Sequence, residues 1–164
     1  MKPCNTLLVS VVAALLAAGC AGSKKDAAPA ASAEAAVPRN LTLGGDQLFA
    51  FGKAGLADIS ADGRGQLDAL AAQLQSARYG LVRIVGFTDR IGSEKANMAL
   101  STRRAEAVRD YLVGQGIPTE RIVATGRGPY QPVAECNSER GQALIDCLAP
   151  NRRVEITVDP PYGP

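Results

Sequence analysis

The stretch VGFTDRIGSEKANMALSTRRAEAVRDY, residues 85–111, contains the change of pattern around which the rest of the chain is organised. A short apolar run ends in Thr88-Asp89, a turn follows, and a helical pattern then begins. At 3.6 residues per turn, the two adjacent arginines separate, so that Arg103 lies on the charged side and Arg104 in the inward stripe. The inward stripe also carries Asn97, Leu100, Ser101, Val108 and Tyr111. An inward arginine needs a role, and Asp89, at the end of the preceding strand, is the obvious residue to share it.

The patterns on either side of this stretch predict a β-α-β-α-β-α-β order. Apolar runs bounded by turn residues indicate strands, and apolar positions at helical spacing indicate helices. Strands are predicted at residues 48–51, 81–87, 122–125 and 153–158, and helices at residues 60–79, 93–112 and 139–148. Two or three helices on one face of a four-stranded sheet would bury the apolar positions, which gives a two-layer α+β fold. Tyr111 and Leu112 are expected in its core.

Residues 1–19 have the features of a bacterial signal peptide. Their apolar run, residues 7–18, is too short to span a bilayer as a stable helix. It leads into LAAGC, residues 16–20, which resembles the lipobox of bacterial lipoproteins, whose cysteine is acylated. Cys20 is therefore the expected lipidation site, and Ala21 after it favours the outer membrane. An ordinary secretory signal with an incidental cysteine is the alternative.

Residues 20–45 are expected to comprise the lipidated cysteine and a flexible linker after it. They are rich in alanine, proline and serine, and they lack large apolar residues at any sustained period. The folded domain is then expected to cover residues 46–159, with residues 160–164 as a tail. A linker between a lipid anchor and a folded domain implies that the domain reaches a target away from the membrane.

The composition argues against several classes of function. The net charge is +2 and basic residues are interspersed with acidic ones, so nucleic-acid binding is a poor interpretation. The chain has no histidine, which removes the usual general base and the commonest metal ligand. We therefore expect neither an enzyme nor a cofactor or metal site.

The four cysteines divide into two that processing would use and two in the domain. Cys4 would be lost with the signal peptide and Cys20 would carry lipid. In an exported protein the remaining pair, Cys136 and Cys147, favours a disulfide. A metal-binding pair is the weaker alternative, because no second pair or histidine completes such a site.

The run GFTDRIGS, then Asn97, Leu100 and Arg104, and finally LIDCLAPNRRVEI carry a family resemblance. The pattern resembles the periplasmic C-terminal domain of outer-membrane protein A, within the wider family that includes the peptidoglycan-associated lipoprotein. The resemblance covers residues 47 to 158, and the cysteines that flank LID match the outer-membrane protein A subgroup. It implies a mixed four-stranded sheet with helices on one face.

The resemblance also implies a ligand and the residues that bind it. Members of this family bind peptidoglycan non-covalently through the diaminopimelate residue of its stem peptide. Asp89 and Arg104 match the pair that holds this ligand. Their surroundings match at Thr88, Asn97 and Leu100, a further contact matches at Arg152, and Phe51 is expected to line the same groove. The motif NRRV leaves open whether Arg152 or Arg153 makes that contact, with Arg152 the better match.

The chemistry of such a clamp is plausible without the family. The free end of diaminopimelate carries an ammonium group, which Asp89 can bind, and a carboxylate, for which Arg104 is a planar partner. The alternative is an internal ion pair between Asp89 and Arg104. Two departures from the family pattern bear on ligand choice: Arg90 could alter the charge of the groove, and Gly52 replaces a polar side chain.

The expected function is a non-catalytic peptidoglycan-binding lipoprotein. It would be anchored in the outer membrane through Cys20, with its domain in the periplasm, and would tether that membrane to the cell wall. The alternative is a periplasmic protein-interaction or assembly module with the same fold and envelope-protein partners, suggested by Arg90 and the altered end of the first strand.

Overall fold

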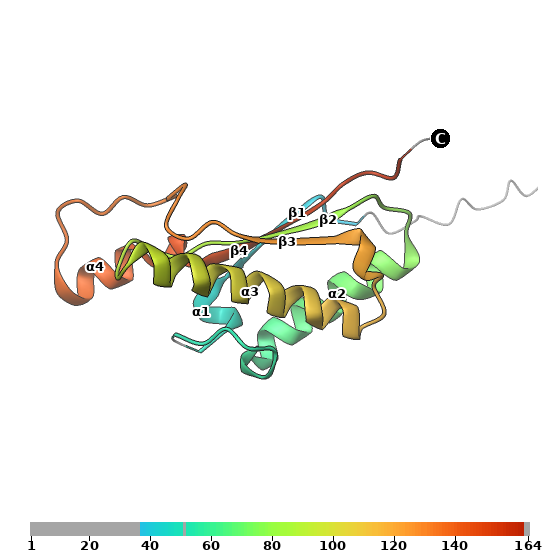
Figure 1. The fold of residues 1–164 in the computed structure, drawn as a ribbon, viewed down its shortest axis with the longest axis horizontal. Helices are drawn as coiled ribbons and strands as arrows, with labels where there is room; N and C mark the ends of the chain where they lie inside the picture. The colour runs from blue at the N-terminus through green and yellow to red at the C-terminus, as the bar shows by residue number, and fades with distance from the viewer. Residues whose placement is uncertain (1–36, 51, 163–164) are drawn as a thin grey trace, which may run out of the picture. The chain divides into compact units, whose positions relative to one another are not determined.

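The computed structural model describes residues 37–50 and 52–162, and among these residues four strands form one sheet (Figure 1). The strands are β1 Asn40–Gly44, β2 Val82–Gly86, β3 Ile122–Gly126 and β4 Arg153–Val158. Their order in the sheet is β1-β4-β2-β3; β2 and β3 are parallel, and β4 is antiparallel to both β1 and β2. The sheet is therefore mixed, as the family resemblance implies.

The two long helices cover one face of this sheet (Figure 1). The helices are α1 Gly45–Leu48, α2 Ala61–Ser76, α3 Glu94–Gly114 and α4 Gly141–Cys147, with 3-10 turns at Leu56–Asp58, Thr119–Arg121 and Ala149–Asn151. Ser60 and Ser93 cap α2 and α3, because their hydroxyl oxygens accept hydrogen bonds from Gly63 N at 3.0 Å and Ala96 N at 3.2 Å. The predicted two-layer α+β fold is confirmed.

The predicted strand at residues 48–51 is wrong. Leu48 ends the short helix α1, and Phe49 makes only an isolated bridge with Ile59. Both side chains are buried, so their apolar character reflects packing and not strand pairing. The first strand is instead β1, which lies inside the stretch expected to be linker, and the folded part therefore begins before residue 46.

Helix α3 packs closely on the sheet because two glycines lie beneath it. A Cβ atom at Gly86 would lie 2.2 Å from the carbonyl oxygen of Ser101, and one at Gly126 would lie 2.4 Å from the backbone nitrogen of Thr102. These two glycines are register partners on β2 and β3. The close approach brings the inward face of α3 against the carboxyl end of β2.

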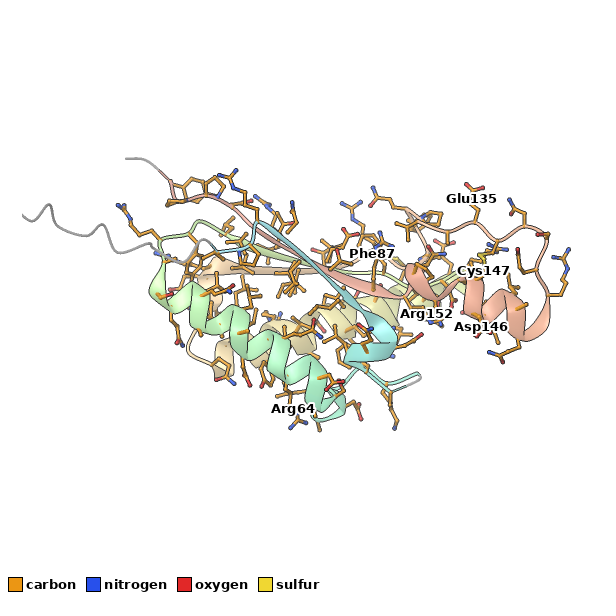
Figure 2. All side chains as sticks on the ribbon, turned by 180° about the vertical axis from the view of Figure 1, so that it is seen from behind. Arg64, Phe87, Glu135, Asp146, Cys147 and Arg152 are labelled. Carbon is orange, nitrogen blue, oxygen red and sulfur yellow. A yellow bond between two sulfur atoms is a disulfide. The ribbon has the colours of Figure 1, made fainter. Side chains whose placement is uncertain are left out.

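The strand register gathers three distant segments at one end of the sheet. Gly44 at the end of β1 pairs with Arg153 at the start of β4, and Gly86 at the end of β2 pairs with Val154. The residues just beyond these ends therefore lie near one another: Asp46, Thr88, Asp89 and Arg152. Phe87, Arg152 and Cys147 also lie toward this end (Figure 2).

Cys136 and Cys147 form a disulfide, as the sequence predicts, and this bond joins the loop after β3 to α4. The guanidinium group of Arg90 donates hydrogen bonds to the backbone oxygens of Glu135 and Cys136, the latter at 2.9 Å. In the described part of the chain, no helix combines the length and apolar character that crossing a membrane requires. The predicted signal peptide, Cys20, most of the predicted linker and Phe51 lie outside the described residues.

Candidate functional site

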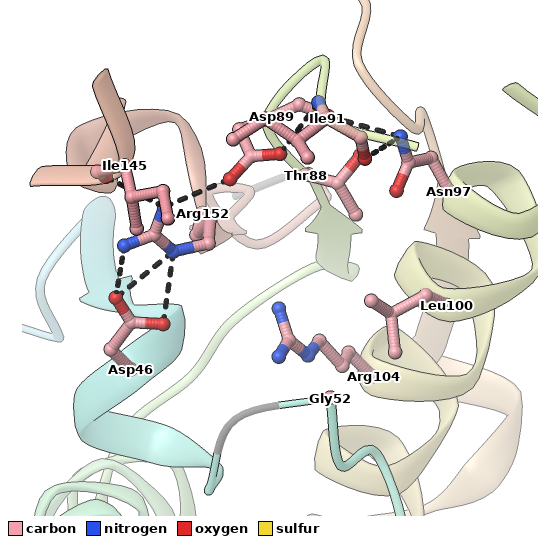
Figure 3. Close-up of a pocket in the computed structure, with 10 residues that line it drawn as sticks. All are labelled: Asp46, Gly52, Thr88, Asp89, Ile91, Asn97, Leu100, Arg104, Ile145 and Arg152. Atoms are coloured by element: carbon pink, nitrogen blue, oxygen red, sulfur yellow. Dashed lines mark hydrogen bonds and ion pairs between the residues drawn. The ribbon is translucent and has the colours of Figure 1, made fainter. Parts of the chain in front are cut away.

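A cavity of about 150 Å³ opens at the end of the sheet where these segments meet (Figure 3). Its lining includes each predicted site residue that the structure describes, namely Thr88, Asp89, Asn97, Leu100, Arg104 and Arg152. Four further residues complete it, namely Asp46, Gly52, Ile91 and Ile145. The residues predicted from the sequence therefore gather around one cavity, and Asp46, Ile91 and Ile145 belong to its wall without having been predicted.

Arg104 points from α3 into this cavity (Figure 3). Arg104 is 2% exposed. Its Nε donates a hydrogen bond to the backbone oxygen of Lys53 at 3.1 Å, and its guanidinium carbon lies 5.5 Å from the centre of the Phe49 ring. The ion pairs among the described residues do not include Arg104. Arg103 is exposed, so the predicted contrast between the two arginines is confirmed.

Burial lowers the pKa of the Arg104 guanidinium, while the charges of Asp46 and Asp89 act in the opposite direction. The internal ion pair between Asp89 and Arg104, the alternative from the sequence, is absent from the described chain. Arg104 is thus a buried cation that faces a cavity without a carboxylate bound to it. Burying a cation in this way is costly, which favours a ligand that would supply the anion.

Asp89 is held in a fixed position at the end of β2. Its Oδ1 accepts a hydrogen bond from Ile91 N at 2.9 Å, and its Oδ2 accepts one from Arg152 Nη1 at 2.8 Å. The side-chain amide of Asn97 donates to the backbone oxygens of Asp89 at 3.2 Å and Ile91 at 3.1 Å. Asn97 therefore anchors the turn that presents the Asp89 carboxylate.

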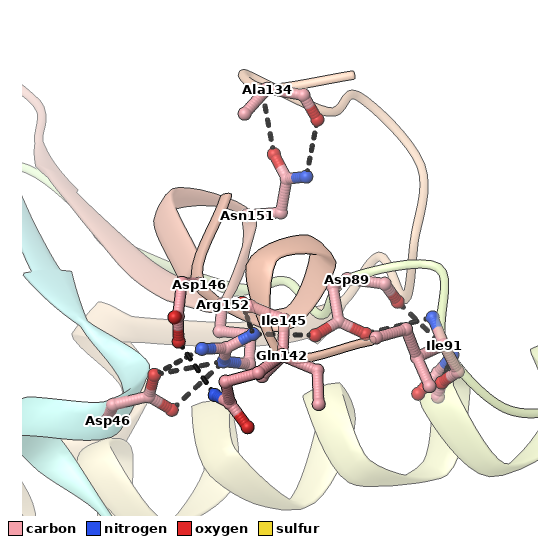
Figure 4. Close-up of polar contacts among 10 residues, drawn as sticks. Asp46, Asp89, Ile91, Ala134, Gln142, Ile145, Asp146, Asn151 and Arg152 are labelled. Carbon is pink, nitrogen blue, oxygen red and sulfur yellow. Dashed lines mark hydrogen bonds and ion pairs between the residues drawn. The ribbon is translucent and has the colours of Figure 1, made fainter. Parts of the chain in front are cut away.

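Arg152 lies between two carboxylates (Figure 4). Its Nε and Nη2 contact Asp46 at 3.0 and 2.6 Å, and its Nη1 contacts Asp89 at 2.8 Å and the backbone oxygen of Ile145 at 3.1 Å. The hydrogen bond with Asp46 is the main reason that the pKa of Arg152 is raised. The neighbouring Arg153 bonds Glu155 at 2.7 Å, stacks on Phe87, and is not part of the cavity lining.

The remaining wall is apolar apart from one hydroxyl group. Thr88 is 4% exposed, and its Oγ1 has no hydrogen-bond partner within the described chain. Leu100, Ile91 and Ile145 supply aliphatic surface. Gly52 has a φ of +71°, and apart from its chain neighbours no atom lies within 4 Å of the position its Cβ would take.

The lining combines charges of both signs with aliphatic surface, which suits a zwitterion on an aliphatic chain. The Cys136, Glu139 and Cys147 side chains are the cluster among the described residues with metal-ligand spacing. Because its two sulfur atoms share a disulfide, they are not available as thiolate ligands.

Comparison with known proteins gives consistent matches. The model of the family described as "OmpA family" matches residues 48–145. Outer membrane protein A of Citrobacter freundii is 43% identical over 146 residues, which cover 84% of this chain and 60% of that protein. Across outer membrane proteins A from this and other species, the chain spans between 35% and 60% of their length.

Solved structures share the fold. The peptidoglycan-associated lipoprotein from Burkholderia pseudomallei superposes with a TM-score of 0.58 at 26% identity, covering 74% of this chain and 91% of that one. The cell wall anchor of the T6SS from Pseudomonas aeruginosa gives a TM-score of 0.59 at 32% identity, covering 74% of this chain and 80% of that one.

Proposed function

The chain belongs to the OmpA family, and from this premise we propose that its folded domain binds peptidoglycan without catalysing a reaction on it. The diaminopimelate residue of the stem peptide would occupy the cavity. Two similar structures support this proposal by name, since one is a peptidoglycan-associated lipoprotein and the other a cell wall anchor.

The observation that carries the proposal is that Arg104, which forms no ion pair among the described residues, lines the same cavity as Asp89. An arginine offers a ligand carboxylate two parallel N–H donors, and an aspartate accepts hydrogen bonds from an ammonium group. The free amino-acid end of diaminopimelate carries both groups on one carbon. The aliphatic chain behind it would lie along Leu100, Ile91 and Ile145.

Sedimentation with purified sacculi tests this proposal. The wild-type protein is expected to co-sediment and to be displaced by free diaminopimelate, but less by cadaverine, which has the same carbon chain and both ammonium groups without the carboxylates. Asp89→Ala and Arg104→Ala should each weaken binding by about tenfold or more, because each leaves a ligand charge without its partner.

Arg103→Ala is the matched control, since it removes an adjacent arginine that is exposed on the same helix. If folded Asp89→Ala and Arg104→Ala proteins bind sacculi as well as Arg103→Ala does, the proposed site is wrong.

We further propose that the domain is anchored through lipid on Cys20 and that the residues between Cys20 and the folded domain act as a tether from the outer membrane. More than one acyl chain on that cysteine would make the anchoring stable. A Cys20→Ser protein, produced in a bacterium that processes lipoproteins, should move from the outer-membrane fraction to another fraction. Unchanged fractionation would argue against the lipid anchor.

The alternative, a protein-interaction module, rested partly on Arg90 changing the charge of the groove. The Arg90 side chain instead bonds the backbone oxygens of Glu135 and Cys136 and does not line the cavity. This observation removes one of the two reasons for that alternative; the other, Gly52 after the first predicted strand, lies in the cavity lining.

A further inference from the structure

Asp46 is an acidic residue of the cavity that has no role in the clamp described above. It lines the cavity together with Asp89, Arg104 and Arg152. Its carboxylate oxygens both lie 3.0 Å from Arg152 Nε, and its Oδ2 lies 2.6 Å from Arg152 Nη2 (Figure 4). This makes Asp46 the main partner of Arg152.

The end of β1 explains why Asp46 reaches that arginine. Gly45 N donates a hydrogen bond to the backbone oxygen of Arg152 at 2.6 Å, so the start of α1 lies directly against the start of β4. A Cβ atom at Gly45 would lie 2.9 Å from that same oxygen and 3.2 Å from Arg104 Nη1. Glycine at position 45 therefore permits the approach that brings the Asp46 carboxylate to Arg152.

The ion pairs within the cavity involve only one of its two arginines. The lining contains two aspartates and two arginines, so the fixed charges cancel. Arg152 contacts both aspartates, whereas Arg104 forms an ion pair with neither. If Asp46 balances the charge of Arg152, then Asp89 and Arg104 remain as the complementary pair for an ammonium group and a carboxylate.

We infer that Asp46 is a positioning residue that determines the charge preference of the cavity: by holding Arg152, it leaves the negative charge of Asp89 available to a ligand ammonium group. Without Asp46, Arg152 pairs with Asp89 alone, and the cavity carries an excess positive charge. Such a cavity still attracts carboxylates but repels ammonium groups. The inference rests on the proposed function, because it concerns a zwitterionic ligand of this site.

Titrations with two ligands of the same carbon chain test this role. One is diaminopimelate, and the other is pimelate, the dicarboxylate without the amino groups. Asp46→Asn should weaken the binding of diaminopimelate by about fivefold and leave the binding of pimelate unchanged or tighter. Asp46→Glu, which keeps the charge, should restore part of the wild-type ratio of the two affinities.

Asp110→Asn is the matched control. Asp110 is a similarly exposed aspartate, at 51% against 46% for Asp46, and it also pairs with an arginine, but it lies outside the cavity lining. Its removal should leave both affinities unchanged. A general loss of structure in Asp46→Asn would weaken the binding of both ligands together, and thermal unfolding would detect that loss.

Two negative results have different meanings. If the wild-type protein binds diaminopimelate and Asp46→Asn changes both affinities in parallel or not at all, Asp46 does not determine the charge preference. If the folded wild-type protein does not bind diaminopimelate, the proposed function fails and this inference fails with it.

Discussion

The hydroxyl group of Thr88 is buried in the wall of the cavity without a partner in the described part of the chain. A buried hydroxyl without a hydrogen bond destabilises the folded state, by about 1–3 kcal/mol. Thr88→Val, which keeps the shape of the side chain, should therefore raise the free energy of unfolding of the ligand-free protein by about 1 kcal/mol. It should also weaken diaminopimelate binding if the hydroxyl bonds the ligand. Chemical denaturation and ligand titration measure the two effects.

Thr102 provides the contrast for this experiment, because its hydroxyl donates a hydrogen bond to the backbone oxygen of Met98 at 2.9 Å. Thr102→Val loses this hydrogen bond and should be less stable than the wild type. If Thr88→Val is destabilised by as much as Thr102→Val, the Thr88 hydroxyl serves the folded state and not a ligand.

The sequence predicts the position of some site residues but not of others. The helical period alone separates the exposed Arg103 from the buried Arg104, because side-chain direction on a helix is a local property. The role of Asp46 is not local. It depends on the register of β1 with β4, which joins residues 106 positions apart, and no spacing in the sequence reports that register.

Among the elements, the contact of α3 with the sheet depends on Gly86. A methyl group there would meet the backbone of Ser101, which cannot move without shifting the helix. Gly86→Ala should therefore lower the free energy of unfolding by roughly 1–3 kcal/mol, the usual range for overpacking a close contact. Because α3 carries Arg104, diaminopimelate binding should weaken as well. Denaturant titrations of the wild-type and Gly86→Ala proteins measure the change in the free energy of unfolding.

Gly65 is the control position for this substitution, since it is exposed on α2 and no atom would lie within 4 Å of its Cβ. Gly65→Ala should stabilise the protein by about 0.5–1 kcal/mol, as alanine does in place of glycine within a helix. Equal stabilities of the two alanine variants would contradict the close packing of α3.

Among the elements, the sequence predicts the starts of the helices better than it predicts the strands. The starts of α2 and α3 follow from capping serines that act within one helical turn, and both are predicted correctly. The strand predicted at residues 48–51 fails because an apolar run reports burial but not hydrogen-bonding partners. β1 is missed for the converse reason, since Leu43 is its one fully buried large side chain and the surrounding composition resembles a linker.

At the scale of the whole molecule, the chain enters the sheet at the end opposite to the cavity. Asn40 at the start of β1 pairs with Thr157 near the end of β4, whereas Gly44 pairs with Arg153 beside the site. Four residue steps along a strand separate these positions by roughly 13 Å. With the proposed tether, the domain would be attached at the end of the sheet away from the cavity, which leaves the cavity accessible to a ligand in the cell wall.

The start of the folded domain can be tested with two proteins that differ by nine residues at the N-terminus: residues 37–164 and residues 46–164. The longer protein keeps β1, whose Leu43 is 1% exposed in the core and pairs with Val154. The shorter protein loses that side chain and leaves one edge of β4 without its partner strand. We expect it to be less stable by at least about 3 kcal/mol and prone to aggregate through the exposed edge.

Thermal unfolding followed by circular dichroism, together with diaminopimelate titration, compares the two proteins. Leu43→Ala in the longer protein separates the loss of the core side chain from the loss of strand pairing. It removes the side chain but keeps the backbone hydrogen bonds of β1, so its stability should fall between those of the two truncated proteins. If the two truncated proteins unfold at the same temperature, β1 does not contribute to the stability of the domain, and the boundary at residue 46 expected from composition is the better one. A stable longer protein with an unstable shorter one would instead show that the linker ends where β1 begins to pair with β4.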